Sequence, residues 1–235
     1  MKIGIMQPYF FPYLDYWQLI NAVDKYVIYD DVNYIKNGWI NRNNILLNGK
    51  KHLLTIPLDG ASPFLLINQI KMTSNFKLKE KLLKTLEQGC KKAPFYHSIY
   101  PIIVKMIMRK DLNIAQAIYE SIKDITAYLN IKTELILSST LVKDNHLKGK
   151  DKVIHICHLL DGTEYYNAIG GMELYNTSDF KKNGIDLKFL KMGDVCYRQF
   201  NNEFIPSLSI IDVLMFNSIE TVQKMLQEYK LRENI

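Results

Sequence analysis

The chain has few of the features that mark secreted or membrane-spanning proteins. Its three cysteines, among 235 residues, lie far apart and form no CxxC pair, which excludes a disulfide framework and favours a reducing compartment. No apolar run approaches the roughly 20 residues of a membrane-spanning helix. Pro8 and Asp15 interrupt the apolar start of the chain, unlike in a signal peptide. We therefore expect a cytoplasmic protein without a membrane span.

Well-known catalytic signatures are absent as well. The sequence contains no GxSxG, HExxH, Walker or GxGxxG motif. The segment from His155 to His158, with Cys157 between, has metal-binding residue types but falls in a predicted helix. Residues two apart in a helix point to different faces, so only the two histidines share one. We therefore expect no structural zinc site in this segment, we assign no metal ligands, and the sequence specifies no cofactor.

The net charge of +6 is modest, and 48% hydrophobic content with 23% charged residues excludes a disordered chain. A chain of this size can bury one large core or two small ones. Its lysines are dispersed, and even the densest clusters, Lys77 to Lys81 and Lys148 to Lys152, are short. Dispersed positive charge indicates solubility and mild attraction to anions, which fits phosphorylated ligands as well as nucleic acid. We expect no nucleic-acid partner.

Alternating apolar strands and helices predict an α/β fold. Residues 2–6 form a short apolar run, 14–23 have helical spacing, and 25–30 are rich in β-branched and aromatic residues. This order predicts a βαβ unit with parallel strands. Further strands are predicted at 52–57, 65–72, 133–137, 164–166 and 186–191, and further helices at 75–88, 96–109, 111–129, 150–160, 177–182, 207–216 and 218–229. We expect one domain over 1–235, with a mostly parallel sheet and a helical insertion or subdomain at about 75–130.

Polar loops follow the predicted strands at their carboxyl ends, where open α/β folds bind ligands. If the strands are parallel, these loops meet at one edge of the sheet. Asp30 and Asp31, which end the second strand, are the candidate catalytic residues, as a general base or as ligands of hydroxyl groups or Mg²⁺. The candidate substrate-binding residues are Gln7, Tyr9, Tyr13, Lys36, Trp39, Asn41, Arg42, Asn43, Ser138, Ser139, Asn167, Gly170 and Gly171.

The residue types in these loops suit a phosphorylated sugar. Aromatic side chains offer flat apolar faces to a base or sugar ring, and the candidates are Tyr9, Phe10, Tyr13 and Trp39. Arg42 and Lys36 can bind a diphosphate, with backbone N–H groups near Gly170 and Gly171 assisting. Gln7 can both donate to and accept from a hydroxyl group.

Each loop also has a purely structural interpretation. Pro8 can simply set a turn, Asp30 and Asp31 can form a solvated turn, and Arg42 can form a surface salt bridge. A structural corner does not require a polar amide between an apolar strand and a proline. We therefore predict that Gln7 and Pro8 begin the floor of a ligand site, and that the Gln7 and Asp31 side chains open on a common pocket.

Ordered motifs along nearly the whole chain resemble those of the WbqC-like protein family. They are Gln7-Pro8, Pro12-Tyr13-Leu14, Val27-Ile28, Asp30-Asp31-Val32, Lys36-Asn37, Trp39, Asn41-Arg42-Asn43, Ile45, Thr55-Ile56-Pro57, Ala93-Pro94-Phe95, Ser138-Ser139, the loop from Tyr165 to Tyr175, Tyr197, Gln199, Phe204, Pro206, Leu208-Ser209 and Asp212. Two positions differ from the usual family pattern. Met6 replaces a histidine before Gln-Pro, and Asn167 to Gly170 replaces Ser-Gly-x-Gly, so a catalytic role for that histidine is not carried over.

The resemblance implies a place in bacterial surface-polysaccharide and O-antigen biosynthesis rather than a defined reaction. We expect an enzyme that acts on a nucleotide-linked sugar and transfers an acyl or related group to it. Transfer is expected to be direct, because Ser138, Ser139 and Cys196 have no recognisable neighbouring base. Two alternatives stay open: a non-catalytic accessory protein that binds nucleotide-sugars or glycans, and an adenylate-forming ligase. The oligomeric state is not determined by these patterns.

Overall fold

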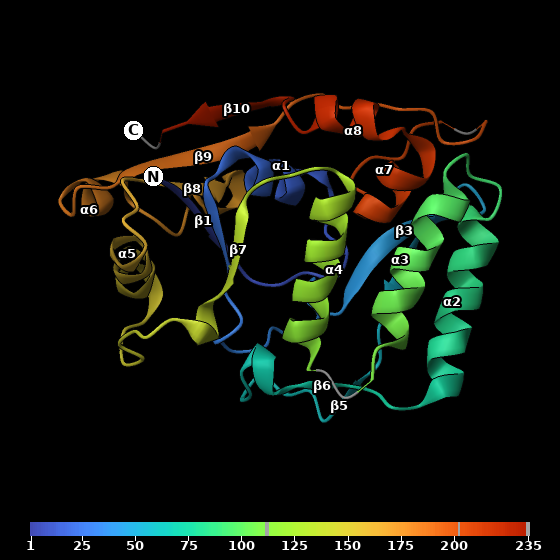
Figure 1. Ribbon diagram of the computed structural model, residues 1–235, viewed down its shortest axis with the longest axis horizontal. Coiled ribbons are helices and arrows are strands. Elements are labelled where there is room, and N and C mark those ends of the chain that lie inside the picture. The colour runs from blue at the N-terminus through green and yellow to red at the C-terminus, as the bar shows by residue number, and fades with distance from the viewer. Residues whose placement is uncertain (111–112, 202, 234–235) are drawn as a thin grey trace.

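The computed structural model describes residues 1–110, 113–201 and 203–233 and has an α/β architecture around a six-stranded sheet (Figure 1). The strand order is β10-β9-β8-β1-β2-β7. The bounds are β1 (Lys2–Met6), β2 (Lys25–Ile28), β7 (Glu134–Leu137), β8 (Glu164–Ala168), β9 (Asp186–Met192) and β10 (Tyr229–Arg232). All neighbouring pairs are parallel except β9 with β10. The prediction of a mostly parallel α/β sheet is confirmed.

The sheet begins with the predicted β-loop-α-β unit. β1 and β2 pair in parallel from Ile3 opposite Lys25 onward, and α1 (Leu14–Ala22) connects them. Ile3 and Ile5 face one side of the sheet, so Gly4 faces the other. A Cβ atom at Gly4 would lie 2.9 Å from the Tyr26 ring, which explains why glycine occupies the middle of the strand.

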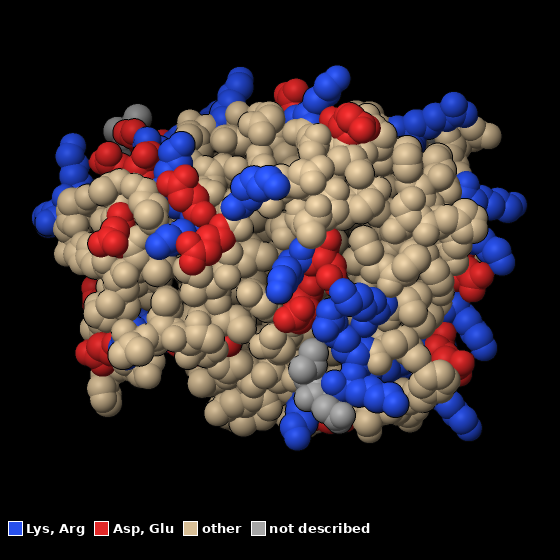
Figure 2. Space-filling model, viewed as in Figure 1, with Lys and Arg blue, Asp and Glu red and all other residues tan. Residues whose placement is uncertain are grey.

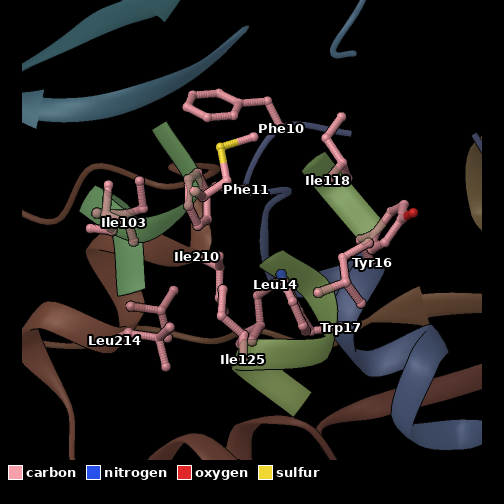
Figure 3. Packing of buried hydrophobic residues seen from close by; sticks show 14 of the residues in the cluster. Phe10, Phe11, Leu14, Tyr16, Trp17, Ile103, Ile118, Ile125, Ile210 and Leu214 are labelled. Carbon is pink, nitrogen blue, oxygen red and sulfur yellow. The ribbon is translucent and has the colours of Figure 1, made fainter. Parts of the chain in front are cut away.

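Strand alternation divides the core between the two faces of the sheet. Val27 and Tyr165 belong to a cluster with α5 (Gly149–Leu159) and α6 (Thr177–Lys181). Their neighbours Ile28 and Tyr166 belong to a larger cluster with α1, α7 (Ile210–Phe216) and the last helix, α8 (Ile219–Met225). Figure 3 shows side chains of this larger cluster from the opening loop, α1 and the later helices.

The helical insertion connects two neighbouring strands, β2 and β7. Its helices are α2 (Phe76–Cys90), α3 (Tyr96–Met108) and α4 (Ile114–Tyr128), which stand side by side (Figure 1). Asn75 and Asn113 cap α2 and α4 by accepting hydrogen bonds from Leu78 N and Gln116 N. Residues 111 and 112, at the start of the helix predicted over 111–129, lie outside the described residues.

Three predictions of local structure are wrong. Residues 41–43 were predicted as loop, but β3 (Arg42–Leu47) begins there and forms a hairpin with β4 (Lys50–Thr55), joined by Asn48 and Gly49 in left-handed conformation. The strand predicted over 65–72 is a 3₁₀ turn, η1 (Ile67–Gln69), preceding the short β6 (Lys71–Met72), which pairs with β5 (Leu58–Asp59). The helix predicted over 218–229 ends at Met225, because the following chain pairs with β9 as β10.

Within the described part of the chain, every helix is too short or too polar to cross a membrane.

Candidate functional site

The connections that follow β1 and β8 leave toward opposite faces of the sheet. The chain after β1 leads to α1 on one face, while the chain after β8 passes through η3 (Ile169–Gly171) to α6 on the other. β1 and β8 are adjacent and parallel, from Lys2 opposite Glu164 to Gly4 opposite Tyr166. At such a point the connections diverge and ligands bind at the carboxyl ends of the strands. This carboxyl edge is the candidate site.

The opening loop at this edge is anchored through its backbone. Phe10 N donates to Trp39 O at 3.0 Å, and Asn43 Nδ2 donates to Phe10 O and Phe11 O at 3.1 and 2.9 Å. Ser209 Oγ also donates to Phe11 O, at 2.6 Å. These bonds hold Phe11 at a φ of 39°, a conformation that costs energy for a bulky residue. The loop is therefore a rigid corner, with Phe10 and Phe11 directed into the core rather than lining a ligand floor (Figure 3).

Gln7 differs from its anchored neighbours. Its main-chain oxygen accepts a hydrogen bond from the Tyr16 hydroxyl at 3.0 Å, which fixes the backbone. Its side chain is partly exposed and forms no hydrogen bond with the part of the chain that the structure describes. Tyr9 and Tyr13 are also partly exposed, and Trp39 is 38% exposed. The rigid loop thus presents one free amide and aromatic surface.

The side chains of Asn41, Arg42 and Asn43 are engaged within the protein. Asn41 accepts from the Tyr34 hydroxyl and donates to Ile56 O, both at 2.9 Å. The Arg42 guanidinium donates to Gly38 O at 3.0 Å and to Asn37 O, while Lys36 is exposed. These hydrogen bonds give each of the three side chains a role in holding the fold. Their binding of substrate stays a prediction.

Asp30 is 2% exposed and joins the end of β2 to η2 (Ser138–Thr140). Its carboxylate accepts from Ser139 N at 2.8 Å, from Ser139 Oγ at 2.6 Å and from Asn68 Nδ2 at 3.3 Å. Both oxygens are therefore occupied, and Asp30 holds together the loops after β2 and β7. A catalytic role for Asp30 would require these bonds to rearrange.

Asp31 lies between two buried lysines. Its Oδ2 is 2.9 Å from Lys143 Nζ and 3.0 Å from Lys152 Nζ, and the three side chains are only 10%, 1% and 8% exposed. Burial raises the pKa of the Asp31 carboxyl, but hydrogen bonds from Lys143, Ser138 and Lys152 outweigh it, so the pKa lies below its usual value. Asp31 therefore stays ionised at neutral pH and is a weak proton acceptor.

The two lysines were missed as site residues. In the sequence, Lys152 was counted only among the dispersed lysines, but its side chain is buried and forms an ion pair with Asp31. Its position carried a signal: it lies four residues before Ile156, on the apolar face of α5. Lys143, in the segment between η2 and α5, carried no comparable signal.

The loop after β8 is close-packed. Asn167 is 7% exposed, and its Oδ1 accepts from Ala168 N at 2.8 Å. A Cβ atom at Gly171 would lie 2.4 Å from Asn167 Nδ2, so this glycine is required for close approach. Gly170 is exposed and faces open space. Of the two glycines, only Gly170 leaves its backbone accessible to a ligand.

Asp15, in the first turn of α1, was not predicted as a site residue. Burial raises its pKa to about 7, against the lowering effect of hydrogen bonds from the Tyr16 backbone and the Tyr13 hydroxyl. The hydroxyl groups of Tyr9, Tyr13 and Tyr26 all feel its charge. A carboxyl group that titrates near neutral pH can exchange protons with a substrate. The single acid within a run of aromatic residues was the available sequence signal.

A second carboxyl group with a raised pKa is that of Asp212, which is 4% exposed. Asp212 in α7 accepts from the Tyr197 hydroxyl at 2.6 Å and from Gln199 Nε2 at 2.7 Å. Burial raises its pKa to about 6, although both hydrogen bonds lower it. This network joins the segment after β9 to α7 and has a structural role.

No group of three His, Cys, Asp or Glu side chains with metal-binding geometry occurs among the described residues. His155 Nε2 accepts from Asp144 N at 3.4 Å, and His158 Nε2 lies 2.9 Å from Asn183 O. Cys157 between them is fully buried. The three residues are thus engaged separately.

Comparison with known proteins gives a consistent result. The family model described as the WbqC-like protein family matches residues 7–224. The chain is also 26% identical over 230 residues to the uncharacterised protein Rv1507c of Mycobacterium tuberculosis, covering 92% of this chain and 93% of that protein. No solved structure matches significantly. The chain belongs to the WbqC-like protein family.

Proposed function

We propose that the protein is an enzyme of bacterial surface-polysaccharide biosynthesis that acts on a nucleotide-linked sugar, transferring an acyl or related group to it. The family resemblance supports the pathway. We infer the class of ligand from one observation. The buried ammonium groups of Lys143 and Lys152 lie beside a single carboxylate, that of Asp31, at the carboxyl edge. Positive charge held at this edge favours a ligand that carries phosphoryl groups.

The rest of the edge suits the sugar and base. Gln7 offers a free amide to a hydroxyl group, and the partly exposed rings of Tyr9, Tyr13 and Trp39 offer apolar faces. Lys36 is exposed and available to an additional phosphoryl oxygen. The rigid opening loop fixes Gln7 and Tyr9 in advance, which lowers the entropic cost of binding.

We assign proton transfer to Asp15. In the transfer, an amine or hydroxyl group of the sugar attacks the carbonyl carbon of an activated acyl donor such as a thioester, and the donor's thiol leaves as the new amide or ester bond forms. The attacking group must lose a proton in this step, and a base is most effective when its pKa lies near the working pH. The pKa of Asp15 is about 7, whereas the pKa of Asp31 is lowered. Asp31 then holds the two lysines in position, and Asp15 accepts the proton.

A nucleotide diphosphate-sugar is expected to raise the melting temperature. A ligand at 100 times its Kd stabilises the native state by about 2.7 kcal/mol. The measurement is a thermal-shift series with UDP-, dTDP- and GDP-sugars at millimolar concentration, with the free sugars as controls. If none of them shifts the melting temperature, the proposed substrate class is wrong. Turnover assays then separate an enzyme from an accessory protein, and ATP-dependent pyrophosphate release would identify a ligase.

Gln7→Ala is expected to weaken binding of that sugar nucleotide by up to about tenfold, the scale of one neutral hydrogen bond. The melting temperature should change by no more than a few degrees, because the Gln7 amide forms no hydrogen bond within the described protein and the substitution removes little apolar burial. Isothermal titration measures the affinity. Gln88→Ala, an exposed glutamine on α2, is the control and should bind as the unmodified protein does. Equal affinities for both variants would place Gln7 outside the site.

A further inference from the structure

The cluster of Lys143, Lys152, Asp31 and Ser138 contains more positive charge than its own carboxylate neutralises. η2 and the segment after it lie above a notch in the lower edge of the molecule (Figures 1 and 2). Lys143 Nζ contacts Asp31 Oδ2 at 2.9 Å and also donates to Ser138 O. Lys152 Nζ contacts the same Oδ2 at 3.0 Å and Asp31 O at 3.2 Å. Two ammonium groups therefore share one carboxylate oxygen.

Two buried polar atoms in this cluster have no hydrogen-bond partner of normal geometry among the described residues. They are Asp31 Oδ1 and Ser138 Oγ. The Ser138 hydroxyl faces the Asp31 carboxylate closely enough to lower its pKa. Ser138 is completely buried and the Asp31 side chain is 10% exposed. Buried polar groups are normally paired, and these two face each other outside normal hydrogen-bond geometry, so each can accept a further partner.

The neighbouring charged groups do not supply that partner. The Asp30 carboxylate forms its hydrogen bonds with the neutral groups of Ser139 and Asn68, and within the described protein Lys143 and Lys152 form their ion pairs with Asp31 and not with Asp30. Lys150 and Asp179 pair with each other at 2.5 Å. Lys152 Nζ also lies 5.1 Å from the centre of the Tyr29 ring, which stabilises a cation without neutralising it.

A phosphoryl group would complete this arrangement. Its oxygens can accept hydrogen bonds from both ammonium groups and from the Ser138 hydroxyl, and charge-assisted bonds of this kind are strong. A buried cation without a full counter-charge is unfavourable, so an anion at this place offsets a cost already present in the fold. Asp31 Oδ1 remains free to accept from a hydroxyl group next to the phosphoryl group, as in a sugar phosphate.

We propose that Lys143, Lys152 and Ser138 bind a phosphoryl group of the substrate, with Asp31 acting as a replaceable internal counter-ion. The assignment deepens the proposed function, and it rests on that function for the identity of the whole ligand. A purely structural alternative is that the lysines only hold the end of β2 in place. The two interpretations differ in how the cluster responds to added anion.

The experiment uses inorganic pyrophosphate and UDP as probes, at constant ionic strength set with NaCl. ³¹P NMR and isothermal titration of the unmodified protein should show binding, and the melting temperature should rise by a few degrees. Lys143→Met and Lys152→Met should each lower the affinity at least tenfold. Lys150→Met removes an exposed lysine of the same helix and should leave the affinity unchanged.

Asp31→Asn gives the most specific result and does not depend on the folding of the lysine variants. It leaves two buried ammonium groups without their carboxylate, so its melting temperature should fall in NaCl alone. Pyrophosphate should restore it and bind more tightly than to the unmodified protein. If pyrophosphate binds neither protein, or if Asp31→Asn is not rescued, the lysines are structural and the proposal is wrong.

The same data separate this proposal from the proposed function. If a nucleotide-sugar binds the unmodified protein and Lys143→Met equally well, the phosphoryl site is wrong and the proposed function stands. If pyrophosphate binding depends on Lys143 while no nucleotide-sugar binds, the phosphoryl site stands and the proposed substrate class is wrong.

Discussion

Asn43→Ala is expected to lower the free energy of unfolding by about 3–5 kcal/mol. The Asn43 amide donates to the buried carbonyl groups of Phe10 and Phe11, and its Oδ1 accepts from Asn44 N at 2.8 Å. Each buried polar group left without a partner costs about 1–3 kcal/mol. Phe11 also loses one of the bonds that hold its left-handed conformation. Urea denaturation measures the loss, as a lower urea concentration at the midpoint of unfolding with an unchanged dependence of the free energy on urea concentration.

Asn33→Ala is the matched control. Asn33 is exposed, and its side chain forms one hydrogen bond with the residues that the structure describes, to Pro63 O, so truncating it should cost no more than about 1 kcal/mol. Asn43→Ala should also weaken ligand binding, because the loop that positions Gln7 loosens, whereas Gln7→Ala affects binding alone. An Asn43→Ala variant with unchanged stability would show that the opening loop does not depend on this amide.

Asp15→Asn is expected to reduce turnover by about 10²–10⁴-fold, the usual contribution of a general base. The same substitution should stabilise the protein at pH 8.

The pKa of Asp15 in the folded protein, about 7, lies above the ordinary value of 3.8. The folded state therefore binds more protons than the unfolded state at pH values between the two. The contribution of Asp15 to stability therefore decreases as the pH rises from about 4 to 7 and is constant above. At about 1.36 kcal/mol per pKa unit, the cost at pH 8 approaches ~4 kcal/mol as an upper bound.

Chemical denaturation of both proteins between pH 4 and pH 9 measures this effect. The unmodified protein should lose stability through neutral pH, and Asp15→Asn should be less sensitive to pH. Asp151→Asn changes an exposed acid in the first turn of α5 and should alter neither activity nor the pH profile. A variant with full activity, or one destabilised at pH 8, would remove Asp15 from the proposed mechanism.

The parallel sheet and its carboxyl edge could be predicted from sequence because they depend on local periodicity. Apolar runs at 2–6 and 25–30 around one helix specify a βαβ unit, and the polar residues after those strands must then share an edge. The same reasoning placed Gln7 and Asp31 at the ends of adjacent strands, as the pairing of β1 with β2 shows. Likewise, the helical insertion followed from long amphipathic segments.

The strand β10 could not be predicted in this way. The helix predicted over 218–229 extends into its first residue, Tyr229, but the open edge of β9 offers unpaired backbone groups that a helix cannot satisfy. Tertiary pairing therefore decided the secondary structure there. The start of β3 was predicted as a loop because Arg42 and Asn43 are polar. The Asn48-Gly49 pair was nevertheless an available signal for a hairpin.

The chemical roles of the site residues were decided only by tertiary structure. Asp31 meets Lys143 and Lys152, 112 and 121 positions along the chain, because β7 lies beside β2 and α5 covers the opposite face from α1. Periodicity indicates which side of an element a residue faces, but not which distant residue it meets there. The same carboxylate could have been a solvated turn or a base, and its two buried lysines make it an ionised counter-ion. Burial and partner identity set a pKa, and both depend on the packing of segments that are remote in sequence.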